Sequence, residues 1–205
     1  MSSAAVTGRV RYAALAVVSA ALLVGGCAAE EPAPEGATAQ PEQPSRPVEL
    51  PVTTMSEEQL CTLLTPEQQA ELGIANPTIG SSTGDVRLPG NADYQHCMWG
   101  SPPDAEPSFG VIVAAIPQSL DAFTEQLGEP FPETAASYEV AGFRAEQQQA
   151  GAGLEGLGCS VFVDVAEGQT LQAWGSPSLT YGLTNQQMCD LAKRVAESAV
   201  ATLQG

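Results

Sequence analysis

The chain has 205 residues, with 24 acidic and 7 basic side chains and a formal net charge of −17. Because Arg9 and Arg11 are the only charged residues before position 27, removal of residues 1–26 would leave 24 acids against 5 bases, a charge of −19. Such a charge repels the phosphates of nucleic acids, so we expect no nucleic-acid partner. It also keeps a surface protein soluble.

The first 27 residues have the layout of a secretory signal. Arg9 and Arg11 precede an uncharged, largely apolar run at residues 13–24, and Val24-Gly25-Gly26-Cys27 closes it. A basic start, a short apolar middle and small residues before the cut are typical of signal peptides. The last four residues resemble a bacterial lipobox, in which diacylglycerol alkylates the thiol and cleavage leaves the cysteine as the first residue. We therefore predict a signal peptide at residues 1–26.

Cys27 is accordingly the predicted lipidation site, with acyl chains such as palmitate holding the protein at the outer face of the cell membrane. A transmembrane anchor is one alternative, but the apolar run is shorter than the ~20 residues that a spanning helix needs. An ordinary secretory cut at another position is the second alternative.

Residues 27–55 form a predicted tether. Between Glu30 and Pro51 there are six prolines, five glutamates and no aromatic residue. Such a segment cannot bury enough apolar surface to offset the entropy lost on ordering, so we expect it to be disordered. The following ~150 residues, 56–205, suit a single domain.

Four helices are predicted, because a residue that can cap a helix N-terminus precedes each run of helically spaced apolar residues. The capping residues are Ser56, Thr65, Ser119 and Thr184. Ser56 and Thr184 are each followed three residues later by glutamine, the pattern of a capping box. The helix after Thr184 gives the strongest signal, since its apolar spacing continues to Leu203.

Strands are predicted where apolar residues alternate or form short runs. The expected strands are residues 94–99, 109–116, 138–147, 159–165 and 170–174. The last two should form a hairpin around residues 166–169.

The tetrapeptide Trp-Gly-Ser-Pro occurs twice, at residues 99–102 and 174–177, each time at the end of an expected strand. Two interpretations stay open. Both tryptophans pack into the core, or Trp99 and Trp174 face a single ligand cleft.

Four cysteines remain once the lipobox has taken Cys27. They are Cys61, Cys97, Cys159 and Cys189. An even set in an oxidising compartment predicts two disulfides. Zinc is the alternative, but no C-x-x-C or Cys/His spacing is present. We expect no metal and no cofactor.

The single histidine, His96, is a weak candidate for catalysis. It neighbours Cys97, which we expect to be oxidised and therefore not a nucleophile. Asp104 and Glu106 lie in an irregular acidic loop without a spacing that suits general acid–base work. The sequence therefore predicts no enzyme.

Two further patterns suggest ligands only weakly. Asp164 and Glu167 lack the additional oxygen ligands of a calcium site, so we expect a solvated turn. The G-x-G-x-x-G pattern at residues 151–156 has no buried strand before it and no helix after it, so it does not predict a phosphate site.

Short stretches around the four remaining cysteines resemble a known family. They are Cys61-Thr-Leu-Leu-Thr-Pro-Glu-Gln, Cys97-Met-Trp99, Cys159-Ser-Val-Phe-Val and Cys189-Asp-Leu-Ala-Lys-Arg-Val-Ala-Glu. In this order, over residues 56–205, they resemble the actinobacterial lipoprotein family catalogued as domain of unknown function 3558. More distantly, they are similar to extracellular sensor domains of some Ser/Thr kinases. The resemblance implies an α+β domain with a twisted antiparallel sheet, helices packed on it and two disulfides. It supplies no catalytic residue.

Four cysteines allow three pairings, and loop-closure entropy does not choose among them. Helix and strand placement favours Cys61–Cys97 and Cys159–Cys189, and the resemblance points to the same pairing. The function that we expect is a non-catalytic binding, sensor or accessory module, held at the membrane by its lipid. Its partner would be an envelope protein or a small ligand. An envelope hydrolase of unknown substrate is the alternative.

Overall fold

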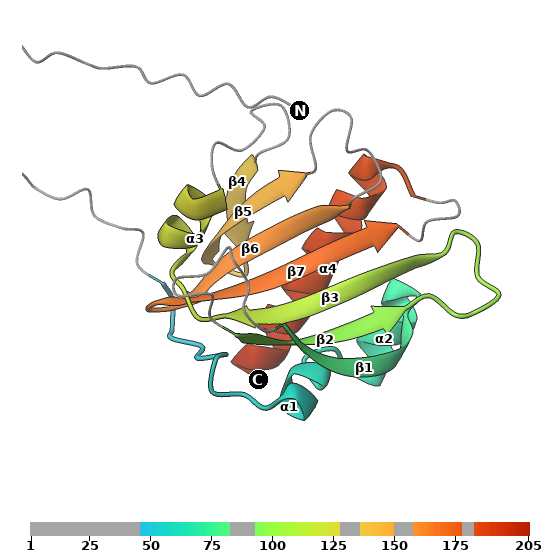
Figure 1. The fold of residues 1–205 in the computed structure, drawn as a ribbon, viewed down its shortest axis with the longest axis horizontal. Helices are drawn as coiled ribbons and strands as arrows, with labels where there is room; N and C mark the ends of the chain where they lie inside the picture. Colours follow the sequence, from blue (N-terminus) through green and yellow to red (C-terminus); the bar gives the residue numbers. More distant parts are fainter. Residues whose placement is uncertain (1–45, 83–92, 128–135, 150–157, 178–182) are drawn as a thin grey trace, which may run out of the picture. The chain divides into compact units, whose positions relative to one another are not determined.

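A seven-stranded antiparallel sheet forms the centre of the structure (Figure 1). The computed structural model describes residues 46–82, 93–127, 136–149, 158–177 and 183–205. In spatial order the strands are β1 (Ala75–Ser82), β2 (Tyr94–Gly100), β3 (Phe109–Ile116), β7 (Gln169–Pro177), β6 (Cys159–Ala166), β5 (Phe143–Gln149) and β4 (Ala136–Val140). Neighbouring strands run antiparallel throughout.

The strand order shows two meanders that meet in the middle of the sheet. β1, β2 and β3 are consecutive neighbours, and so are β4, β5, β6 and β7. β7 returns to pair with β3, which joins the two halves. Between β3 and β4 the chain forms α3 (Leu120–Leu127), so that β4 begins at the far edge of the sheet.

Three helices cover one face, which we call the α4 face. α4 (Asn185–Gln204) passes behind the sheet in Figure 1 and packs mainly on β7 and β6, while α1 (Glu57–Cys61) packs on β2 and β1. α2 (Pro66–Leu72) contacts α4. All three begin at predicted caps: the side chains of Ser56, Thr65 and Thr184 each accept from the backbone N–H three residues on.

The opposite face, which we call the α3 face, carries a smaller cluster. The rings of Phe123 in α3 and Phe162 in β6 lie 5.1 Å apart, and Ala114, Ile116 and Leu120 are buried around them. The larger core lies between the sheet and α1, α2 and α4. Together the sheet, the helices on it and the two disulfides described below confirm the predicted α+β fold.

One predicted strand is wrong, because residues 138–147 are a hairpin. β4 ends at Val140 and β5 begins at Phe143, with Ala141 and Gly142 as a two-residue turn. Both turn residues have positive φ, 51° and 86°, as a type I′ hairpin requires. Ala-Gly is a weak turn signal, so the alternating pattern appeared to run through it. The edge strand β1 was also not singled out, since Asn76, Pro77, Gly80 and two serines are poor strand formers.

The folded domain starts earlier than predicted. Residues 46–55, which we call the strap, were assigned to the disordered tether, but Val52 is 0% and Leu50 8% exposed. The Leu50 N–H donates to the carbonyl of Val165 at 2.9 Å. Leu50 and Val52 alternate with prolines and glutamate, and this short apolar signal was hidden by the composition of the segment. Residues 1–45, with the signal and the lipobox, lie outside the described residues, as does the glycine-rich loop at 151–156.

No helix in the described ranges combines the length and the apolar character that crossing a membrane would require.

Candidate functional site

Both predicted disulfides are present, and each ties a helix to the sheet. Cys61, the last residue of α1, bonds to Cys97 in β2, with Cα atoms 5.1 Å apart. Cys159 in β6 bonds to Cys189 in α4, with Cα atoms 5.0 Å apart. They close loops of 36 and 30 residues, worth about 3–4 kcal/mol each in the chain-entropy model. All four sulfurs are thereby unavailable as nucleophiles or metal ligands.

Trp99 and Trp174 do not share a cleft. They lie on the two strands that flank β3, where Trp99 pairs with Val111 and Trp174 with Ile112. Consecutive residues of a strand point to opposite faces of the sheet. Trp99 is therefore in the core of the α4 face, 2% exposed, whereas Trp174 is half-buried on the α3 face. Of the two open interpretations, a single cleft shared by both tryptophans is therefore ruled out, and core packing holds fully only for Trp99.

His96 covers a glycine of the edge strand. A Cβ built on Gly80, which pairs with His96, would lie 2.6 Å from the imidazole Nε2, so the ring occupies the space above that glycine. The Tyr94 ring centroid is 6.0 Å from that of His96. Burial lowers the pKa of His96 from its usual 6.5, and the charge of Glu57 raises it by less. The imidazole thus packs over the edge glycine, and burial favours its neutral form by lowering its pKa.

Asp164 is the centre of an ion-pair network, not a calcium ligand. Its carboxylate lies 3.3 Å from Arg46 Nε of the strap and 4.0 Å from Arg144 Nε of β5. Arg144 also pairs with Asp121 of α3 at 2.6 Å. Among the described residues no group of three or more His, Cys, Asp or Glu side chains could hold a metal ion.

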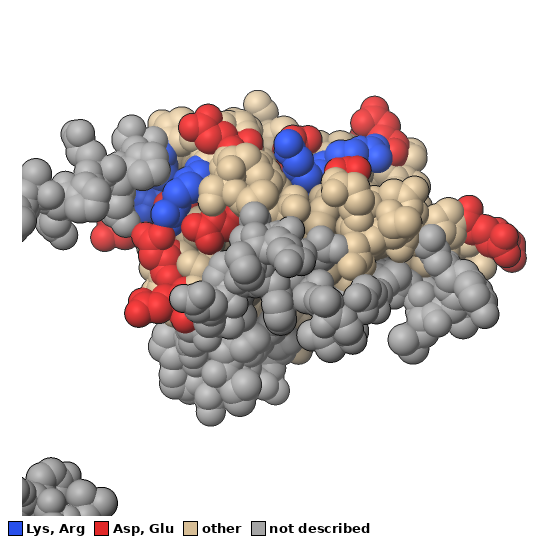
Figure 2. All heavy atoms as spheres, turned by 90° about the horizontal axis from the view of Figure 1, so that it is seen from above, with Lys and Arg blue, Asp and Glu red and all other residues tan. Residues whose placement is uncertain are grey.

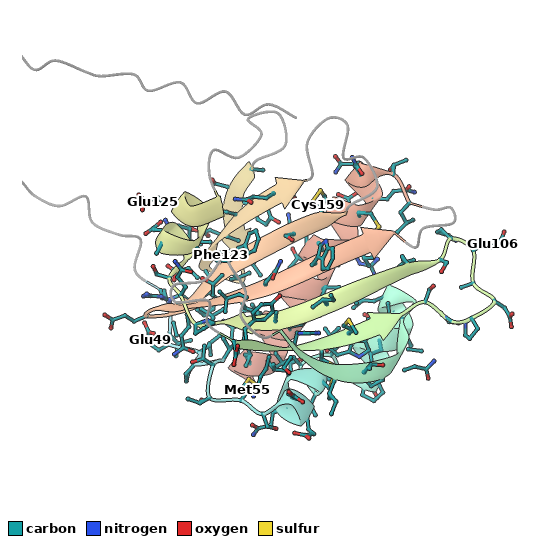
Figure 3. All side chains as sticks on the ribbon, viewed as in Figure 1. Glu49, Met55, Glu106, Phe123, Glu125 and Cys159 are labelled. Atoms are coloured by element: carbon teal, nitrogen blue, oxygen red, sulfur yellow. A yellow bond between two sulfur atoms is a disulfide. The ribbon has the colours of Figure 1, made fainter. Side chains whose placement is uncertain are left out.

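The other weakly supported acidic pair is far from this network. Asp104 and Glu106 are exposed in the β2–β3 connection, at the opposite end of the sheet from Glu49 (Figure 3). Glu49 belongs to the strap, and its Oε2 accepts from the Glu167 backbone N–H at 2.7 Å. Asp104 and Glu106 therefore belong to an exposed connection, and Glu167 to the turn between β6 and β7.

A pocket of about 340 Å³ lies where the strap, α1 and the ends of three strands meet. We call it the strap pocket. Its lining residues are Thr53, Glu57, Ser81, Asp93, Tyr94, Gln95, Ala115 and Pro117. They come from five separate segments, so no motif or spacing in the sequence could have identified them. The pocket is large enough for a small ligand or a single side chain of a partner.

A second hollow, of about 310 Å³, lies between α2 and α4. The two helices are joined across it, because Gln68 Nε2 donates to the Ser198 carbonyl at 3.2 Å and Arg194 donates to the Glu71 carbonyl at 2.9 Å. These hydrogen bonds hold the helices together, and we assign the hollow a structural role.

A family model described as "Protein of unknown function (DUF3558)" matches residues 22–202. The chain belongs to this family. The match extends N-terminally beyond the strap and spans the sheet, both disulfides and the strap pocket. No curated protein and no solved structure matches the chain. Because the family description states no activity, the function must be argued from the residues of this member.

Proposed function

We propose that this member of the family is a lipid-anchored envelope protein whose folded domain is a non-catalytic binding or accessory module on the outer face of the membrane. The observation that carries the proposal is the pair of disulfides in the domain that follows the predicted signal and lipobox. Structural disulfides persist in oxidising compartments and are rare in the reducing cytosol. Disulfides and an export signal therefore support the same location.

The side chains near His96 support binding over catalysis. Nucleophilic hydrolysis needs a nucleophile within hydrogen-bond reach of its base. His96 packs over Gly80, and the neighbouring Cys97 points to the opposite face and is bonded to Cys61. The strap pocket supplies a concave surface of a size that suits a small ligand or a partner's side chain. The resemblance to actinobacterial lipoproteins, and more distantly to kinase sensor domains, supports a sensor or accessory role.

The anchor is tested by detergent phase partition of the protein from its native cells. Wild-type protein should enter the detergent phase, and Cys27→Ser should be released or remain as uncut precursor. Mass spectrometry of the N-terminal peptide should show a diacylglyceryl cysteine, because two or more acyl chains are needed for stable anchoring. Wild-type protein recovered in the aqueous phase would refute the lipoprotein assignment.

A further inference from the structure

One outer strand of the sheet, β1, has an open edge. It stands last in the strand order, and its described partner is β2. Regular pairing with β2 runs from Thr78 to Ser82, and we call this stretch the β1 edge. Among the described residues, none outside β2 makes a backbone hydrogen bond with it. Its outward N–H and C=O groups therefore have no strand to pair with in the part of the chain that the structure describes.

The β1 edge has little protection against strand addition. Proteins usually protect an edge strand with charged side chains, with proline or with a bulge. β1 has Pro77 and a register shift between Ala75 and Thr78, so both devices lie at its start. Residues 78–82, Thr-Ile-Gly-Ser-Ser, carry no charge. Pairing is thus hindered before Thr78 and unhindered after it.

The other outer strand, β4, is protected in the usual way. It has only five residues and includes the exposed Glu139, and Lys193 Nζ lies 4.7 Å from the centroid of the Tyr138 ring. Figure 2, which views the molecule from the β4 side of Figure 1, shows basic and acidic side chains intermixed on this side. The two edges of the sheet therefore differ in charge, and only the β1 edge is neutral.

Exposed apolar side chains gather at the β1 edge, which is an independent observation. Of the three large hydrophobic residues that are exposed in the described ranges, Ile79 (47%) lies on β1 and Met98 (37%) lies opposite Thr78 on β2. Ile79 is opposite Cys97, whose side chain is bonded to α1, so Ile79 faces the α4 side and Met98 the α3 side. A strand added to β1 would cover apolar surface on both faces.

Two further features suit a strand laid along this edge. Gly80, in the middle of it, has no side chain, and glycine within a strand is common where another backbone approaches closely. Near its end, Ser81 also lines the strap pocket of about 340 Å³. In strand addition, main-chain hydrogen bonds provide affinity and pockets beside the edge hold single side chains. The strap pocket is placed to hold one side chain of the added strand.

Charge decides between a second copy of this chain and another protein. Glu57 of α1 lies beside the β1 edge, because it lines the strap pocket together with Ser81 and its charge acts on His96, the partner of Gly80. Two copies joined edge to edge would bring both Glu57 side chains together, in chains that each carry a net charge of −17. Like charges oppose such a pair, whereas a basic partner is attracted.

We infer that the β1 edge binds an extended, basic segment of a partner protein, which adds a strand to the sheet beside residues 78–82. This inference rests on the proposed function, since it names the kind of partner that the binding module takes.

The test is calorimetric titration of the full mature protein, purified in a non-ionic detergent, with the peptide acetyl-(Lys-Val)₄-amide. Acetyl-(Lys-Pro)₄-amide is its match, because it has the same charge but lacks every second backbone N–H and cannot pair as a strand. We expect the Lys-Val peptide to bind with a Kd of roughly 0.1 mM or tighter at low salt, and the Lys-Pro peptide about tenfold more weakly or not at all. Absent binding of the Lys-Val peptide, or equal binding of the two, would overturn the inference.

Hydrogen exchange measured by mass spectrometry locates the bound peptide. In the free protein, the outward N–H groups of residues 78–82 should exchange rapidly. The Lys-Val peptide should slow their exchange, and the Lys-Pro peptide should not. Full protection without any peptide would show that another segment of this chain covers the edge, and protection only at other residues would show a different binding surface. Either result would overturn the inference.

Ile79→Lys tests the edge by substitution. It removes an apolar contact and places a like charge beside the basic peptide, so binding should weaken about tenfold. Val48→Lys is the matched control, because Val48 is 49% exposed and its neighbour Pro47 lies beside Gly142 of the β4–β5 turn. Equal weakening in the two variants would reveal a general effect of charge and overturn the inference. The comparison of the two peptides on wild-type protein stands even if a variant fails to fold.

Sedimentation of the wild-type protein without peptide tests for a second copy. We expect one copy of the chain per particle. Pairs of copies that Ile79→Lys separates would assign the β1 edge to self-association and overturn the inference of a partner protein.

Phase partition of the same preparation separates the two proposals. An anchored protein that ignores the Lys-Val peptide would overturn only the inference about the β1 edge. A protein that binds this peptide at residues 78–82 but stays in the aqueous phase would overturn only the membrane location.

Discussion

Trp99 and Trp174 lie on either side of β3 but one residue apart in register, opposite Val111 and Ile112. The same tetrapeptide thus ends two strands of the same sheet with its aromatic ring on opposite faces. Because Trp99 is buried in the main core and Trp174 is half-buried, their energetic roles should differ. Trp99→Ala should lower the free energy of unfolding by about 3–5 kcal/mol, and Trp174→Ala by clearly less. Urea denaturation measures both, and equal losses would contradict the assignment of faces.

Gly175 allows α4 to approach the sheet. A Cβ at this position would lie 2.9 Å from Met188 Cε and 3.1 Å from the Met188 carbonyl oxygen. The methyl group can move, but the carbonyl belongs to the backbone of α4, next to the Cys159–Cys189 bond. Gly175→Ala should therefore destabilise the domain by about 1–3 kcal/mol. Gly100→Ala is the matched control, since its Cβ would meet nothing within 4 Å. A comparable loss of unfolding free energy in Gly100→Ala would contradict this explanation.

Val52 makes the strap part of the core. Its side chain is 0% exposed, whereas Val48 in the same segment is 49% exposed. Val52→Ala should cost about 2 kcal/mol of unfolding free energy, from lost apolar burial and the small cavity left behind. Val48→Ala should change the unfolding free energy by less than about 0.5 kcal/mol. If both variants unfold at the wild-type urea midpoint, the strap does not belong to the cooperative unit.

Tyr138 should make stability fall at alkaline pH. Burial, with a smaller contribution from Glu197, raises the pKa of Tyr138 from 10.0 to about 12. The folded state therefore keeps a proton that the unfolded state releases, so stability is lost as pH rises from 10 towards 12. Tyr138→Phe should remove this loss.

At neutral pH, Tyr138→Phe should also stabilise the domain by about 1 kcal/mol, because the buried hydroxyl has no hydrogen-bond partner among the described residues. Thermal unfolding of wild type and variant at pH 7, 10 and 11 tests both statements. Parallel losses in the two proteins would show that another group controls the alkaline range.

The pKa of His96 is sensitive to the charge of Glu57. Because His96 is the only histidine in the chain, its ring signals in an NMR spectrum need no assignment by mutation. Burial lowers the pKa of His96 and Glu57 partly offsets this. Glu57→Gln should therefore lower the His96 pKa further in an NMR titration, while Glu58→Gln should have little effect. An unchanged pKa in Glu57→Gln would place the carboxylate too far away to matter.

The same shift links pH to stability. Because the folded pKa lies below 6.5, the unfolded state binds the proton more readily, and stability is lost as pH falls below 6.5. His96→Gln should flatten the stability profile just below pH 6.5, before carboxylates begin to titrate. A profile identical to that of the wild type would rule out a contribution from His96.

The sequence alone determined those features that depend on contacts within a few residues. The capping boxes at Ser56 and Thr184 and the buried pattern of β3 predicted their elements correctly, because caps and alternation are local. The disulfide pairing followed from the same helix and strand assignments together with the family resemblance.

Only the tertiary structure decided how the elements face one another. Alternation tells which residues of a strand share a face, but a one-residue offset between neighbours decides which face that is, as Trp99 and Trp174 show. Val52 looked like part of the tether because the Gln169 side chain that accepts from its backbone N–H lies more than 100 residues away in the sequence. The strap pocket, whose Glu57 and Asp93 come from different elements, exists only once the sheet has assembled, since no local interaction brings its walls together.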